Sequence, residues 1–193
     1  MGQSQSTRKS EPGAVYRAKA AEHAQARAEA LRKSQRALSS SNYHNAEAHS
    51  LEARMHQQKM IEFNALASRE IFRHHNPKHP SNSSTSSFFG AMFSLFVTVP
   101  NDLSRLDLHG QYVSEAIPMV EDHLKRCRRQ GVKKTLIITG RGAHSPGGVA
   151  RIKPEVEALL VGMGVKYRRS GKGAFVVASY LLNFLFPVVL VIN

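Results

Sequence analysis

Two short segments of the chain combine acid–base residues with glycines. The first, RLDLHG at residues 105–110, places Asp107 and His109 between leucines. In an extended strand the side chains alternate between two faces, so Leu106 and Leu108 point one way and Asp107 and His109 the other. A carboxylate beside an imidazole can hold a histidine that moves protons. This face is therefore either solvated or part of a catalytic site.

The second segment, GRGAHS at residues 140–145, is a glycine-rich loop. Gly140 and Gly142 permit a positive φ, so that successive backbone N–H groups can turn toward an anion. Arg141 can bind a phosphate through two N–H groups. The spacing departs from both G-x-x-x-x-G-K-[ST] and G-x-G-x-x-G, which argues against a nucleoside triphosphatase and a dinucleotide enzyme. A purely structural turn between a strand and a helix is the alternative.

Two histidines near such a loop indicate acid–base chemistry on a phosphodiester. One of His109 and His144 would take the proton of a ribose 2′-hydroxyl, and the other would protonate the leaving 5′-oxygen. Asp107 would hold His109 or orient the sugar. The cations expected to stabilise the negative charge of the transition state are Arg141, Arg151 and Lys153. This chemistry requires no metal and no cofactor. A helix-capping or core histidine bonded to backbone is the other interpretation of His109.

The elements that must position these segments form one α/β domain over residues 102–178. Strand patterns cover 103–109, 134–139, 165–170 and 174–177, and helix patterns cover 113–131 and 149–164. The order β-α-β-α-β-β predicts a two-layer domain. If the first two strands are parallel, their C-terminal ends lie on one edge of the sheet, where Asp107 and His109 would meet the glycine-rich loop.

Residues 14–76 predict an all-α helical hairpin. Positions 14–75 contain no proline or glycine, and Ser39–Asn42 interrupts the helical pattern with a turn. An apolar stripe that includes Ala18, Ala28 and Leu31 predicts the packed face of the first helix. The stripe is thin, which favours stabilisation by a partner.

The remaining segments have distinct compositions. Residues 1–13 are polar and expected to be disordered, and residues 77–101 form a linker that contains an apolar run at 88–99. Residues 179–193 form an apolar tail that is short for a membrane span and is interrupted by Pro187. A single cysteine, Cys127, favours a reducing compartment and a cytoplasmic location.

The formal net charge of +13 favours phosphate-rich partners, either nucleic acid or an anionic membrane. Residues 101–180 carry 14 basic and 7 acidic side chains, and residues 1–80 carry 13 and 7. Both halves are therefore basic. Arg168 and Arg169 lie in a basic cluster near the last predicted hairpin and are candidates for contact with a phosphate backbone. A solvated basic face is the alternative.

Together these features resemble the small MutS-related (Smr) domain. LDLHG, followed by IITGRGAHSPGG, looks like its L-D-x-H-G and T-G-x-G elements, and residues 14–76 are similar to the helical domain of unknown function that precedes Smr in many eukaryotic proteins. The resemblance implies a fold similar to the C-terminal domain of bacterial translation initiation factor three. It also implies nucleic-acid binding and, in many members, endonuclease activity, with eukaryotic relatives implicated in mRNA quality control on stalled ribosomes.

The motif positions carry over residue by residue. The first element falls on Asp107, His109 and Gly110, and the second on Gly140, Arg141 and Gly142. The longer eukaryotic form of the second element also includes His144 and Ser145.

The sequence therefore predicts a cytoplasmic endoribonuclease that acts on RNA, with ribosome-bound mRNA as a candidate substrate. The alternatives are a non-catalytic adaptor that binds RNA or ribosomes, a DNA-nicking endonuclease, and a membrane-tethered scaffold. The last rests on MGQSQS, which fits the N-myristoylation pattern at Gly2, and on the apolar tail as a second membrane signal.

Overall fold

The computed structural model describes residues 11–82, 102–143 and 145–178. The chain divides into two compact units, with the boundary between Ile71 and Phe72. Gly2, the apolar run 88–99, His144 and the tail 179–193 lie outside the described residues. Among the described residues, no helix has the length and apolarity needed to cross a bilayer.

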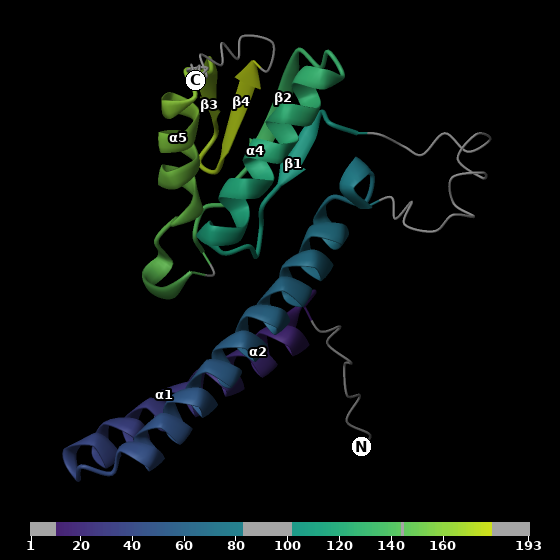
Figure 1. Ribbon diagram of the computed structural model, residues 1–193. Helices are drawn as coiled ribbons and strands as arrows, with labels where there is room; N and C mark the ends of the chain where they lie inside the picture. The colour runs from purple at the N-terminus through teal and green to yellow at the C-terminus, as the bar shows by residue number, and fades with distance from the viewer. Residues whose placement is uncertain (1–10, 83–101, 144, 179–193) are drawn as a thin grey trace, which may run out of the picture. The chain divides into compact units, whose positions relative to one another are not determined.

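The first unit is the predicted helical hairpin. Helix α1 spans Ala14–Ser39, and α2 spans Tyr43–His75, of which the residues up to Ile71 belong to this unit (Figure 1). The turn at Ser39–Asn42 ends with Asn42, whose side-chain oxygen accepts a hydrogen bond from the backbone N–H of Asn45 at 3.2 Å. This is the contact that an N-capping asparagine makes, and it starts α2.

The packed face of α1 differs from the predicted stripe. Leu31 is 37% exposed, and α1 instead buries Ala20, Ala30 and Ser34. The Ser34 hydroxyl donates to the backbone oxygen of Ala46 at 2.9 Å. Small residues let two helices approach closely, so in an alanine-rich helix the positions of alanines and polar contacts select the packed face, and the leucines do not.

The second unit contains a four-stranded sheet in the order β1-β2-β4-β3 (Figure 1). Strands β1 and β2 are parallel, with Asp107 opposite Ile138, and the other pairings are antiparallel. The predicted strands are confirmed, with shorter bounds in three of them: β1 Arg105–Asp107, β2 Lys134–Ile138, β3 Tyr167–Ser170 and β4 Ala174–Ala178. The parallel pair brings the ends of β1 and β2 to one edge of the sheet.

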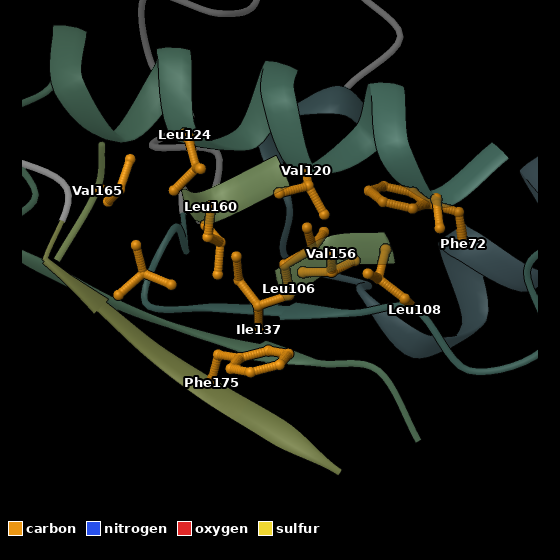
Figure 2. Close-up of a cluster of buried hydrophobic side chains, with 12 residues drawn as sticks. Phe72, Leu106, Leu108, Val120, Leu124, Ile137, Val156, Leu160, Val165 and Phe175 are labelled. Carbon is orange, nitrogen blue, oxygen red and sulfur yellow. The ribbon is translucent and has the colours of Figure 1, made fainter. Parts of the chain in front are cut away.

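Two helices, α4 (Val113–Arg129) and α5 (Ile152–Gly162), complete the predicted two-layer α/β domain. Their apolar side chains share one cluster with the sheet, as Figure 2 shows. The alternation expected in RLDLHG holds, because Leu106 and Leu108 both enter this core with no exposed surface. Other members of the cluster are Val120, Leu124, Ile137, Val156, Leu160 and Phe175.

The residues from Phe72 to Asn82 belong to this second unit rather than to the hairpin. Phe72, in the last turn of α2, joins the core at 9% exposure. The expected linker at 77–101 begins inside the same unit, because His79 is 4% exposed and a short 3-10 helix, η1, follows at Pro80–Asn82. The end of α2 is thereby brought next to β1.

Candidate catalytic site

Asp107 is a buried carboxylate at the end of β1. Its side chain is only 4% exposed, and its Oδ1 accepts hydrogen bonds from the backbone N–H of His109 at 3.1 Å and from His109 Nδ1 at 2.5 Å. Its Oδ2 accepts from the guanidinium of Arg105 at 2.5 Å. Burial alone would raise the pKa of Asp107, but these bonds from His109 and Arg105 outweigh it and hold that pKa below its usual range. The carboxylate therefore stays ionised.

His109 is held by this carboxylate and reaches solvent on its other side. Since an ionised carboxylate only accepts, Nδ1 of the ring must donate, which leaves the lone pair of the neutral imidazole on Nε2. The imidazole is 48% exposed. Its Nε2 lies beside Gly140, where a Cβ atom would come within 3.4 Å of it. Nε2 of His109 therefore faces the glycine-rich loop, and the two segments meet at one edge of the sheet, as the sequence predicts.

The glycine-rich loop has the backbone that the sequence indicates. Gly140 and Gly142 have φ values of +76° and +81°, which favour glycine. At Gly142 a Cβ atom would also lie 2.4 Å from the backbone nitrogen of Ala150, so no other residue fits there without rearrangement. The turn between β3 and β4 closes over the loop, with Gly140 N–H donating to the Gly173 oxygen at 3.2 Å.

The cations predicted to contact phosphate are spread over several elements. Arg141 in the loop, Arg151 before α5 and Arg168 on β3 are exposed. Lys153 donates to the backbone oxygen of Lys172 at 3.1 Å, which ties the start of α5 to the β3–β4 turn. The guanidinium of Arg169 makes two hydrogen bonds of 2.9 Å to Glu157 on α5.

Two smaller motif positions also fall near this edge. Gly110 follows His109 with a φ of +74°. The backbone N–H of Ser145 donates to the oxygen of Gly142 at 2.9 Å, which closes the loop on itself.

Two residues that the sequence analysis did not identify contact this pair. Asn76 bonds to both backbone groups of Asp107. His75 places its ring centroid 5.9 Å from that of His109. Burial lowers the pKa of His75, opposed by the charge of Asp107 and reinforced by His74, His109 and Arg105. The one sequence feature that could have pointed to His75 and Asn76 is their position directly before Pro77, where the predicted helix ends.

A small cavity adjoins these two residues. Its volume is about 160 Å³, and it lies between the end of α2 and the start of β1. Its charged lining is mixed, with Lys78 and Arg105 beside the acidic Asp102, and Arg105 is already paired with Asp107. The lining residues are His75, Asn76, Pro77, Lys78, His79, Asp102 and Arg105.

Comparison with protein families gives the class of protein. Residues 14–76 match the domain of unknown function DUF1771, and residues 106–179 match the Smr domain. The chain is therefore an Smr-domain protein in which a DUF1771 domain precedes the Smr domain. The predicted resemblance is confirmed in both segments.

Particular relatives share parts of this chain. NEDD4-binding protein 2 of Homo sapiens is 34% identical over 157 residues, which make up 79% of this chain and 8% of the human protein. Endonuclease NBR9 of Saccharomyces cerevisiae is 28% identical over 93 residues, which make up 46% of this chain and 39% of the yeast protein. The solution structure of the SMR domain of NEDD4-binding protein 2 is 38% identical, covers 39% of this chain and 83% of that one, and has a TM-score of 0.35.

Proposed function

We propose that this protein is an endoribonuclease and that His109 is its proton acceptor. One observation carries the proposal: the buried carboxylate of Asp107 holds Nδ1 of His109, so that Nε2 faces Gly140 in the glycine-rich loop. The name of the related Endonuclease NBR9 supports a nuclease in general. The RNA preference comes from the chemistry of the site.

The reaction follows from one imidazole acting as a base. Nε2 of His109 takes the proton of a ribose 2′-hydroxyl, and the 2′-oxygen attacks the adjacent phosphorus. The bond from phosphorus to the 5′-oxygen breaks, and that oxygen leaves with a proton from a second group. The products are a 2′,3′-cyclic phosphate and a 5′-hydroxyl. DNA lacks the 2′-hydroxyl, so it cannot react by this route.

The cations near the same edge would stabilise the extra negative charge of the transition state. Arg141 is exposed in the loop next to Gly140 and can bind a phosphate oxygen through two N–H groups. Lys78 and Arg105, which line the cavity beside β1, would hold a neighbouring phosphate of the bound RNA. We expect RNA to be the partner in the cytoplasm, and ribosome-bound mRNA to be one of its forms.

The decisive experiment compares the full chain with its His109→Ala variant on an end-labelled single-stranded RNA in EDTA. We expect the wild type to produce 2′,3′-cyclic phosphate ends. His109→Ala should lower the rate about 100- to 10,000-fold, the usual contribution of a general base, with RNA affinity retained. His44→Ala, at an exposed histidine of α2, is the matched control and should cleave normally.

Other outcomes would assign one of the alternatives. Products with 5′-phosphates that form only with Mg²⁺ would contradict the mechanism but keep the nuclease. Nicking of supercoiled plasmid without cleavage of RNA would indicate a DNA endonuclease. Binding of RNA with no cleavage by either protein would indicate an adaptor.

A further inference from the structure

Asn76 joins the end of α2 to the outer edge of β1. Its Oδ1 accepts from the backbone N–H of Asp107 at 2.7 Å, and its Nδ2 donates to the backbone oxygen of Asp107 at 2.8 Å. The residue is 5% exposed. One side-chain amide thus pairs with both backbone groups of Asp107, as the backbone of a neighbouring strand would.

Among the described residues, no strand pairs with this side of β1. Strand β1 is the end strand of the sheet and has three residues. Its bonds to β2 are made on either side of Asp107, with Leu108 N–H donating to the oxygen of Ile138 at 2.8 Å. The N–H and carbonyl of Asp107 therefore point away from β2. Without Asn76 they would lose their partners in a buried place, which is costly.

Asn76 is itself held from several directions. Its Nδ2 also donates to the backbone oxygen of Phe72 at 3.1 Å, and Phe72 packs in the core of the second unit. The backbone oxygen of Asn76 accepts from His79 N–H at 3.0 Å and from the side chain of Asn82 at 2.5 Å. Because the side chain of Asn76 is held in one position, it can hold the backbone of Asp107 in one position.

We infer that Asn76 is a positioning residue of the site: it holds the backbone of Asp107, whose carboxylate in turn orients His109. The inference rests on the proposed function. Asn76 is also the last residue of the DUF1771 match, but it belongs to the same compact unit as Asp107 and His109. The support that it gives therefore comes from within the second unit.

The test uses the full chain with Asn76→Ala and, as a control, Ser34→Ala. Ser34 is 5% exposed and donates to the backbone oxygen of Ala46, so its variant also loses a buried hydrogen bond, but one in the first unit. Cleavage of a labelled RNA is measured at a temperature where thermal unfolding shows both variants folded. The nitrogen NMR signals of the His109 ring report which nitrogen carries the proton.

We expect Asn76→Ala to lower kcat about 10- to 100-fold, because small displacements of a catalytic group cost that much, with KM within threefold of the wild type. The ring of His109 should lose its fixed Nδ1–H form. Ser34→Ala should keep both properties.

Two results would overturn the inference: a loss of kcat no larger than that of Ser34→Ala, or unchanged ring signals of His109. If the wild type cleaves no RNA, the proposed function fails, and the ring signals then decide alone whether Asn76 positions His109.

Discussion

Asp107 is the residue on which the site depends most directly. One carboxylate oxygen receives two hydrogen bonds from His109, and the other receives the guanidinium of Arg105. Because the carboxylate is buried and ionised, it can hold the imidazole in one orientation without competition from water. A single residue thus decides which nitrogen of His109 faces Gly140.

The proposed reaction also needs a proton donor for the leaving oxygen, and two histidines are candidates. His144 follows the glycine-rich loop in the sequence and lies outside the described residues, and the ring centroid of His75 lies 5.9 Å from that of His109. Both His75→Ala and His144→Ala can be tested against two substrates. One is a dinucleotide, and the other carries a p-nitrophenyl leaving group that needs no proton.

The variant at the true donor should lose about 100-fold or more of its activity on the dinucleotide and keep its activity on the aryl substrate. A variant at a residue that only orients His109 should lose activity on both substrates equally. Equal losses for both variants on both substrates would contradict an imidazole donor at either position.

At the scale of elements, the turn from α2 to η1 is bound to α4 and β2 by buried histidines. Ser81 N–H donates to Nδ1 of His79 at 3.2 Å, so Nε2 of His79 carries the proton that goes to Nδ1 of His123 at 3.0 Å. Nε2 of His123 then donates to the hydroxyl of Thr135 at 2.7 Å. Each of these three hydrogen bonds has both a donor and an acceptor only when both histidine rings are neutral.

Acid should therefore weaken this connection. Burial lowers the pKa of His123 from 6.5 to about 4, reinforced by His79 and Arg126 and opposed by Asp122 and Asp102. Burial also lowers the pKa of His79. In the unfolded chain His79 and His123 take up a proton near pH 6.5, whereas in the folded chain they stay neutral at that pH. Stability is thus full above pH 6.5, falls as the pH drops, and levels off for His123 below about 4.

Denaturant unfolding at a series of pH values measures this effect. For His123 the shift corresponds to a loss of up to about 3 kcal/mol between these pH limits. His123→Gln should be less stable at pH 8 but should lose less stability on acidification. In His44→Gln the free energy of unfolding should change with pH as in the wild type. If it also changed with pH in this way in His123→Gln, the buried ring of His123 could not be neutral in the folded chain.

The parts of the site that depend on local geometry could be predicted from the sequence, and the parts that depend on distant contacts could not. The two faces of RLDLHG and the positive φ of Gly140 and Gly142 follow from local geometry, and they are confirmed. Asn76 lies 31 positions from Asp107, so its contact depends on how the chain folds rather than on local pattern. The packed face of α1 was predicted wrongly for the opposite reason, because the local pattern of alanines allowed more than one face.

At the scale of the whole molecule, positive charge is shared by the two domains. Residues 1–80 contain 13 basic and 7 acidic side chains, a balance close to that of residues 101–180. Arg36 and Arg54, one on each helix of the hairpin, are exposed. If the hairpin binds the RNA backbone, it adds affinity without taking part in the reaction.

Salt dependence tests this division of roles. For single strands the logarithm of the binding constant falls with the logarithm of salt concentration by about 0.7 per phosphate neutralised. The double variant Arg36→Gln and Arg54→Gln should bind RNA more weakly and reduce this slope by up to about 1.4. Its kcat at saturating RNA should stay within twofold of the wild type. Glu47→Gln, which removes an exposed acidic charge from α2, should bind at least as tightly as the wild type. An unchanged slope in the double variant would show that the hairpin's charge at these positions does not contact RNA, and the affinity would then have to come from the Smr domain alone.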